Sequence, residues 1–364
     1  MRPSCLVLET GEIFSGYCFE EVESQAGEVV FNTSHSGYEE ISTDPSYFSQ
    51  ILVMTAPLQG NYGASKEFWE SQKVWIKGFL CVEMQNTKRE NHWMKTLKKH
   101  EVPLLTHIDT RRLVLRLRDQ GVVWGAIVPV SKQSKEKALN LIKATKKSQI
   151  KDWTQLVSTQ KIVKLKGEQN NDIKLALIDF GFKKNILREL LKRVSEVSIF
   201  PSRLNSLESI KKYLPDGILL SNGPGDPKAV IEGTKLVKQL LKWRFLFGIC
   251  MGHQILAQSL GAKNYKLKFG HRGSNHPIKD FLLDKIYMSA QNHGYAIDPK
   301  SLSEGIKVSH TNLNDQTIAG IFSENNKCLG VQFHPENHPG PRESSSLFDT
   351  FINYVKADKK KGFS

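Results

Sequence analysis

Cysteine is scarce in this sequence. The 364 residues include only five cysteines, which is an odd number, and no two of them form a Cys-x-x-Cys pair. A disulfide framework and a zinc ribbon are therefore both disfavoured. Four of the cysteines are expected to be small core side chains. Cys250 differs from them because glycines stand two positions before it and two positions after it.

Long hydrophobic runs are also missing. No segment approaches the 18 or more uninterrupted apolar residues that a membrane-spanning helix needs. The apolar stretch near Met1 is too short for a signal peptide before Glu9 and Gly11 interrupt it. We therefore expect no contact with a membrane and a cytoplasmic location.

The sequence has no recognisable motif for binding nucleic acid or nucleotides. The net charge is +14, but the excess is diffuse and lysine-rich, as in 132–166 and 356–361. No aromatic residues alternate with these lysines, so a solvated basic surface, or one that meets acidic partners, is the better interpretation. Lys228 is misplaced for a phosphate-binding loop of the G-x-x-x-x-G-K-[ST] type. We expect no cofactor and no resident metal in this chain.

The composition and the pattern of the first half indicate two domains. A chain of this length with 39% hydrophobic and 24% charged residues is an ordinary globular protein. Residues 1–130 are rich in strand patterns, and a hairpin is expected from 4–9 and 12–19. Segment 32–50 looks too polar for the core and is expected to be a loop. Residues 131–172 form a lysine-rich helix followed by a polar linker.

Residues 173–364 change to a regular alternation of strands and helices. Near-continuous apolar strands that alternate with helices indicate an α/β fold with a doubly wound, mostly parallel sheet covered on both faces. Such sheets place their sites at the carboxyl ends of the strands. The expected strands are 174–180, 197–200, 217–222 and 245–249.

The strongest chemical signal follows the last of these strands. Gly248-Ile249-Cys250-Met251-Gly252 is a G-x-C-x-G nucleophile elbow between a strand and a helix, the thiol counterpart of G-x-S-x-G. The glycines permit a sharp turn, and the dipole of the next helix favours the reactive thiolate. The alternative of a buried core cysteine beside two turn glycines is improbable in this context.

A cysteine nucleophile needs a base and a group that orients the base. His334-Pro335-Glu336 ends an apolar run, and in an extended segment His334 and Glu336 project to the same side. His253 on the elbow helix is a rival base. A metal cluster of His334, Glu336 and His338 is conceivable but weaker, because Pro339-Gly340-Pro341 follows at once.

A dense turn, Ser221-Asn222-Gly223-Pro224-Gly225-Asp226-Pro227, follows another of the expected strands. It is either a tight strand-to-helix connection or part of an oxyanion hole. In the second case, one of its backbone N–H groups and that of Met251 would face the developing negative charge.

These segments together resemble the class I (triad) glutamine amidotransferase family. The pieces that carry the resemblance are NGPGDP at 222–227, GICMGHQ at 248–254 and HPE at 334–336. Further pieces are similar to the family of glutamine-hydrolysing small subunits of carbamoyl-phosphate synthase and cover nearly the whole chain, N-terminal domain included. They are 27–51, 107–114, 179–190, 268–278 and 290–296.

The resemblance implies roles for particular residues. Cys250, His334 and Glu336 match the family's triad, and Ser46 matches a glutamine contact from the N-terminal domain. Other glutamine-binding positions of the family fall on Gly223, Gly225, Met251, Gln254, Asn292, Gly294 and Tyr295. Met251 and Tyr295 depart from the Leu and Phe of the family, and neither change removes a catalytic group.

The resemblance also implies a partner. Ammonia released from L-glutamine would pass to a large ATP-using synthetase subunit that makes carbamoyl phosphate for the pyrimidine and arginine pathways. ATP and Mg²⁺ would belong to that subunit. The alternatives are an amidotransferase subunit of another synthase, a catalytically silent regulatory module, and a nucleic-acid-binding protein argued from charge alone.

Overall fold

The computed structural model describes residues 1–19 and 23–362, which divide into two compact units. The first unit comprises Met1–Ile150 and Leu267–Gly273, and the second comprises Lys151–Lys266 and Ser274–Ser364. The boundary at residue 150 therefore lies inside the segment expected as helix and linker. The lysine-rich helix belongs to the first unit and the polar stretch after it to the second.

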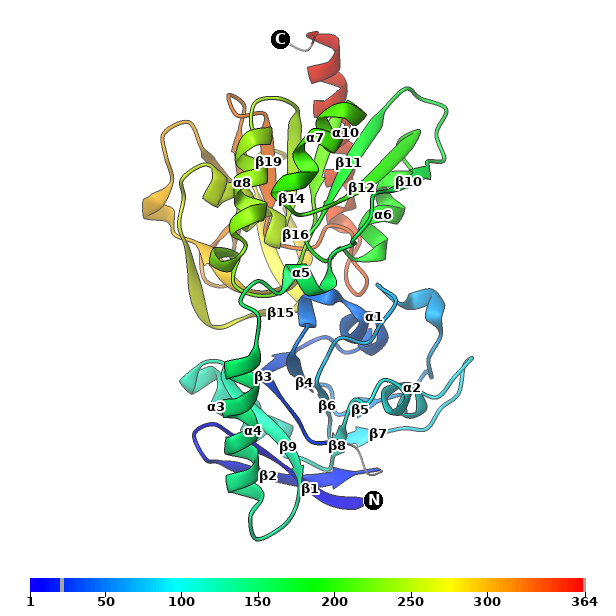
Figure 1. The fold of residues 1–364 in the computed structure, drawn as a ribbon, viewed down its shortest axis with the longest axis vertical. Coiled ribbons are helices and arrows are strands. Elements are labelled where there is room, and N and C mark those ends of the chain that lie inside the picture. The colour runs from blue at the N-terminus through cyan, green and yellow to red at the C-terminus, as the bar shows by residue number, and fades with distance from the viewer. Residues whose placement is uncertain (20–22, 363–364) are drawn as a thin grey trace. The chain divides into compact units, whose positions relative to one another are not determined.

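The first unit is built around a small barrel (Figure 1). Its strands are β1 (Arg2–Leu8), β2 (Ile13–Cys18), β3 (Gln25–Asn32), β4 (Gln50–Met54), β5 (Leu58–Gln59), β6 (Gly78–Leu80), β7 (Glu83–Met84), β8 (Leu104–Thr106) and β9 (Val123–Pro129). Its helices are α1 (Tyr38–Thr43), α2 (Trp93–Lys99), α3 (Thr110–Gln120) and α4 (Ser134–Ser148), with short 3₁₀ turns η1 (Pro45–Tyr47) and η2 (Lys66–Phe68). The barrel closes in the order β1-β2-β8-β6-β4-β3-β9, while β5 and β7 pair separately.

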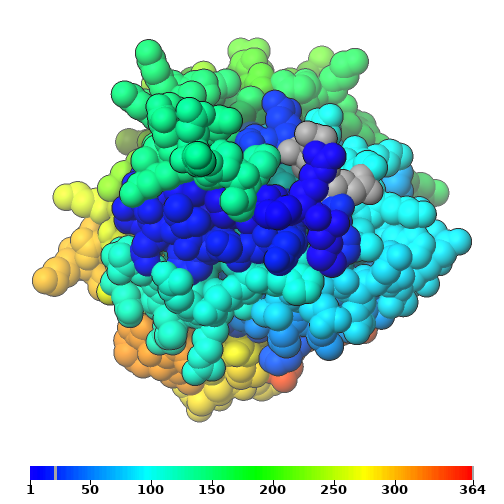
Figure 2. All heavy atoms as spheres, turned by 90° about the horizontal axis from the view of Figure 1, so that it is seen from below, coloured from blue at the N-terminus to red at the C-terminus, as the bar shows by residue number. Residues whose placement is uncertain are grey.

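Alternation along β1 explains how two helices cover this barrel. Successive side chains of a strand point to opposite faces. Leu6 and Leu8 join the cluster that contains Leu113 and Leu117 of α3, whereas Cys5 and Val7 pack against α4. Figure 2 shows α4 lying along the β1–β2 hairpin. The hairpin itself was predicted and is confirmed, with Val7 opposite Ile13.

The prediction that 32–50 is a loop too polar for the core was wrong. This segment contains α1 and η1, and Glu39 of α1 is fully buried. The Glu39 carboxylate accepts hydrogen bonds from the backbone N–H of Ser65 at 2.7 Å and from Trp69 Nε1 at 3.3 Å, and pairs with Arg89. A polar segment can be buried when each polar group finds such a partner.

The second unit contains a large sheet with helices on both faces (Figure 1). Its strands are β10 (Val163–Lys166), β11 (Lys174–Asp179), β12 (Glu196–Pro201), β13 (Gly217–Leu220), β14 (Phe245–Ile249), β15 (Asn264–Asp280), β16 (Lys285–Ile297), β17 (Lys307–Asn312), β18 (Ile318–Ser323) and β19 (Cys328–Val331). The middle of β15, residues 267–273, belongs to the first unit. Its helices are α5 (Thr154–Val157), α6 (Lys184–Leu191), α7 (Leu207–Tyr213), α8 (Ile231–Leu240), α9 (Met251–Ser259) and α10 (Ser346–Lys360). Short 3₁₀ turns are η3 (Leu204–Ser206), η4 (Pro227–Ala229), η5 (Pro299–Ser301) and η6 (Glu343–Ser345).

The predicted parallel sheet is confirmed for the strands that carry the alternation. β12, β11, β13, β14 and β19 are neighbours and run parallel. Helices α6 and α10 pack on one face, and α7, α8 and α9 pack on the other. Beyond β19 the sheet continues through β18 and β17 in antiparallel pairing. The carboxyl ends of β11, β13, β14 and β19 therefore meet at one edge.

Candidate active site

Cys250 occupies a strained position between β14 and α9. It is the residue immediately before α9 and has φ 52° and ψ −104°, a conformation that is rare for a residue with a side chain. Its backbone N–H donates to the Val331 carbonyl at 2.8 Å. A Cβ at Gly252 would lie 2.2 Å from the Leu220 carbonyl oxygen, so only glycine fits there. The strain is thus held by backbone contacts, as is common at functional sites.

His334 follows β19 and lies beside the elbow. Its backbone N–H donates to the Ala290 carbonyl at 2.9 Å, and its Nδ1 lies 2.7 Å from Glu336 Oε1. Burial lowers the pKa of His334, but the neighbouring Glu336 carboxylate and the Cys250 side chain outweigh it and raise the pKa to about 10. The imidazole is therefore held as a cation between the thiol and the carboxylate. The Cys250 thiol also donates to the Asn292 carbonyl at 3.5 Å.

Lys183 completes this arrangement and was not selected from the sequence. Its Nζ lies 3.0 Å from Glu336 Oε1, and the two side chains are 4% and 0% exposed. Burial raises the pKa of Glu336, but Lys183 and then His334 lower it more, to about 2. The same ammonium donates to the Asn337 carbonyl, and the Asn185 side chain donates to the Glu336 carbonyl. Lys183 lies in the loop after β11, at one of the strand ends where ligands are expected. This position in the sequence is the feature from which its role in the site could have been predicted.

Replacing Lys183 tests this buried pair. We expect Lys183→Met to leave the Glu336 carboxylate buried without its cation, which lowers the free energy of unfolding by about 3 kcal/mol. Lys192→Met is the matched control, because Lys192 pairs with Glu189 while itself 52% exposed. Urea unfolding of both variants measures the difference, and equal, small effects would show that the Lys183 pair adds no stability.

The glutamine-binding positions expected in the second unit lie around the elbow. Gln254 of α9 donates through Nε2 to the Tyr295 carbonyl at 2.9 Å and to Gln332 Oε1 at 3.0 Å. Asn292, Gly294 and Tyr295 lie on β16, which contacts His334 through Ala290. Cys250 and Met251 are both buried at the start of α9. The structure therefore brings the elbow, β16 and His334 together.

The loop after β13 also lies against the elbow. The Gly252 N–H donates to the Ser221 carbonyl at 2.9 Å. A Cβ at Gly223 would lie 2.3 Å from the Phe180 carbonyl oxygen, and Gly225 has φ 94°. Glycine is thus required at Gly223 by the close approach of two loops. The last expected residue, Ser46, is buried in η1 of the first unit, where its N–H donates to Asp44 Oδ1 at 2.8 Å.

The other histidines considered from the sequence have different surroundings. His253 is fully buried, and a Cβ at Gly330 would lie 2.7 Å from its Nδ1. Burial and the neighbouring His310 lower the pKa of His253 to about 3. Burial, followed by the charge of Lys183, lowers the pKa of His338 to about 4. Both imidazoles are therefore neutral near pH 7.

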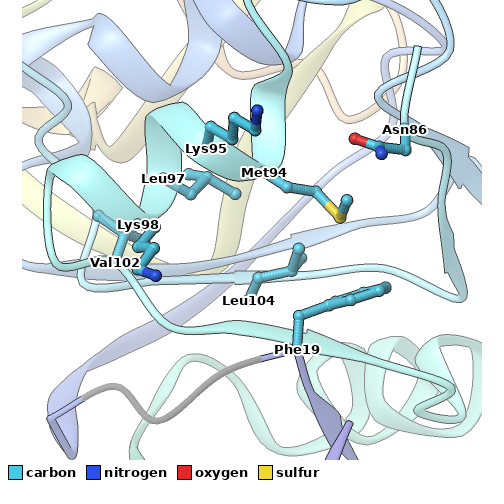
Figure 3. Close-up of a pocket in the computed structure, with 8 residues that line it drawn as sticks. All are labelled: Phe19, Asn86, Met94, Lys95, Leu97, Lys98, Val102 and Leu104. Carbon is cyan, nitrogen blue, oxygen red and sulfur yellow. The ribbon is translucent and has the colours of Figure 1, made fainter.

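Other features of the described residues lie apart from this set. The first unit contains an apolar cavity of about 190 Å³ lined by Phe19, Leu97, Val102 and Leu104, among others (Figure 3). No expected site residue lines it.

Within 1–19 and 23–362, no cluster of three or more His, Cys, Asp or Glu is arranged to hold a metal ion. No helix in the same residues has both the length and the apolar character needed to cross a membrane.

Comparison with known families agrees with this geometry. Residues 176–354 match the family described as "Glutamine amidotransferase class-I". This match covers the elbow, the loop after β13, β16 and the segment with His334 and Glu336. The second unit is therefore a class I glutamine amidotransferase domain.

The first unit identifies the family more closely. Residues 6–127 match "Carbamoyl-phosphate synthase small chain, CPSase domain". The chain is 42% identical over 370 residues to the carbamoyl phosphate synthase small chain of Aquifex aeolicus, covering 98% of this chain and 99% of that protein. It is 40% identical over 363 residues to the pyrimidine-specific small chain of Bacillus subtilis, covering 98% and 97%. This chain belongs to the carbamoyl phosphate synthase small chain family.

Proposed function

We propose that this chain hydrolyses L-glutamine and delivers the ammonia to a large ATP-using subunit that makes carbamoyl phosphate. The observation that carries the proposal is the buried series Cys250, His334, Glu336 in a domain of the amidotransferase family. The match of the first unit favours carbamoyl phosphate synthase over another synthase.

The first half of the reaction uses Cys250 and His334. The Cys250 thiolate attacks the side-chain amide carbon of glutamine. His334, held protonated by Glu336, donates its proton to the nitrogen as the C–N bond breaks and ammonia leaves. A thioester between Cys250 and the glutamyl group remains.

The second half releases glutamate. Neutral His334 accepts a proton from water, which attacks the thioester carbon, and the Cys250 sulfur leaves as thiolate. Glu336 orients His334 in both steps, and Lys183 keeps Glu336 ionised at 3.0 Å.

Backbone donors would stabilise the oxyanion of both steps. The N–H of Gly252 already donates to the Ser221 carbonyl, so we assign the elbow's donor to Met251. The second donor would come from the loop that contains Gly223 and Gly225. Loss of one such donor typically costs about 3 kcal/mol in the barrier.

Glutamate release and partner capture test the proposal together. The chain should release glutamate from glutamine in a way that added salt changes little. A pull-down from native lysate should retain a large chain that uses ATP. Glutamate release without such a chain would favour the amidotransferase subunit of another synthase, and no glutamate release with the partner bound would favour a silent regulatory module.

Ser46 tests whether the first unit contributes to glutamine binding. We expect Ser46→Ala to raise the KM for glutamine about tenfold, the effect of losing one hydrogen bond, with kcat less affected. Ser42→Ala is the control, since Ser42 is also buried and lies on α1. Steady-state kinetics with glutamine measure both, and an unchanged KM for Ser46→Ala would remove Ser46 from the glutamine site.

A further inference from the structure

A second pair of buried polar side chains lies in the amidotransferase unit. Asp280 ends β15 and His310 lies on β17, and the two residues are opposite each other in the strand pairing. His310 Nε2 lies 3.4 Å from Asp280 Oδ2, and both side chains are 0% exposed. Within the described residues neither atom meets the full geometry of a hydrogen bond with any partner, so the two are held as a buried ion-pair contact. None of the reaction steps above uses this pair.

Both residues are fixed by further contacts. Asp280 Oδ1 accepts from the backbone N–H groups of Leu282 at 2.8 Å and Leu283 at 3.1 Å. Burial raises the pKa of Asp280, but His310 and these N–H groups lower it below its usual value, so the carboxylate stays ionised. His310 Nδ1 lies 2.9 Å from Ser309 Oγ. A Cβ at Gly320 would lie 2.4 Å from that nitrogen, so the imidazole ring is confined from the side of β18 as well.

The His310 ring supports the residue that precedes His334. Its centroid lies 5.5 Å from that of Phe333 at an interplanar angle of 64°. Tyr287 of β16 contacts Phe333 in a similar way at 5.8 Å. Phe333 is fully buried. Because Phe333 and His334 share a peptide bond, a shift of the Phe333 ring would move His334 relative to Cys250 and Glu336.

We propose that Asp280 and His310 are positioning residues for His334, acting through the packing of His310 on Phe333. Asp280 fixes the orientation of the His310 ring, and the ring fixes Phe333. A buried ionised carboxylate is costly unless it is paired, and here its pairing restrains the segment that carries the base. This inference rests on the proposed function, since it assigns the pair to the hydrolysis of glutamine.

Removal of the His310 ring tests the role directly. In the complex with its ATP-using partner, His310→Ala should lower kcat for glutamine hydrolysis about tenfold, because a shift of the base by a fraction of an ångström is costly. The KM for glutamine should stay within about twofold, since neither residue belongs to the glutamine-binding set. The double variant Asp280→Asn/His310→Phe restores a ring without leaving a buried charge, and should recover most of kcat.

The pH profile separates positioning from loss of stability. The charged and titratable groups that face His334 are Cys250, which immediately precedes α9, and Glu336, which is itself paired with Lys183. A displaced His334 gains less from Glu336, so its pKa falls, and the basic limb of the kcat profile should move to lower pH by about one unit. Phe200→Leu is the control, because Phe200 is buried in the same unit against Tyr213 rather than Phe333. It should lower the melting temperature without moving the profile.

Each outcome supports or contradicts either the proposed function or the positioning role of Asp280 and His310. An inactive wild-type complex would contradict the proposed function, and with it the positioning role, because that role assumes that the chain hydrolyses glutamine. An active wild type with an unchanged kcat and pH profile in His310→Ala would overturn the positioning role alone, as would a change no larger than that of Phe200→Leu. If His310→Ala melts below the assay temperature, Asp280→Asn decides instead, with the same shift of the basic limb expected.

Discussion

Cys250→Ser should abolish carbamoyl phosphate synthesis from glutamine and leave synthesis from ammonium salt intact. The substitution exchanges one small atom, so the fold and the surface that meets the partner should survive. A serine hydroxyl stays protonated near neutral pH and is a far weaker nucleophile than a cysteine thiolate. We expect glutamine-dependent synthesis by the assembled complex to fall by about a thousandfold or more. The assay is carbamoyl phosphate formed from each nitrogen source at fixed ATP and bicarbonate.

Cys328→Ser is the matched control for this experiment. Cys328 is buried at the start of β19, and burial raises the pKa of its thiol to about 12, so it is a core side chain. Both activities should persist in that variant, with some loss of stability. Retained glutamine-dependent synthesis in Cys250→Ser would remove Cys250 as the nucleophile. Loss of both activities in an assembled complex would mean that Cys250 has a structural or coupling role.

His334→Asn should have the second-largest effect. It removes the only group that we assign to proton transfer, so glutaminase turnover should fall by about a thousandfold while glutamine binding remains measurable. Glu336→Gln should cost less, because the proton carrier stays and only its orientation and charge are disturbed. Glutamate release under saturating glutamine, with binding followed separately, measures both variants.

His253→Asn accompanies these variants as the test of the rival base. Since the His253 ring is fully buried and its pKa is lowered to about 3, the change should affect stability more than turnover. A near-normal rate in His334→Asn together with a large loss in His253→Asn would reverse the assignment.

The parts of the site that short sequence motifs determine could be predicted. The elbow around Cys250 needs glycine at fixed spacing, and His334 and Glu336 share one side of an extended segment. The strand ends of a parallel sheet meet at one edge, so the loops after β13 and β14 could be expected to lie together. The observed contact between Gly252 and the Ser221 carbonyl shows this.

Residues that act through long-range pairing were not predicted from the sequence. Lys183 and Glu336 are 153 positions apart, and their contact depends on the parallel order of β11 and β19 in the sheet. Asp280 and His310 meet only because β15 pairs with β17 in one register. The buried α1 was missed because its polar residues are satisfied by distant partners, as Glu39 is by Arg89. Local periodicity contains none of this information.

The most direct test of the central claim is covalent labelling of Cys250. A chloroketone analogue of glutamine should alkylate Cys250 faster than any of the other cysteines, which are Cys5, Cys18, Cys81 and Cys328, all of them buried. Glutamine should protect Cys250 in proportion to its occupancy of the site, and Lys183→Met and His334→Asn should slow the labelling. Peptide mapping that finds another cysteine labelled first, or Cys250 labelled at the same rate with and without glutamine, would contradict the assignment.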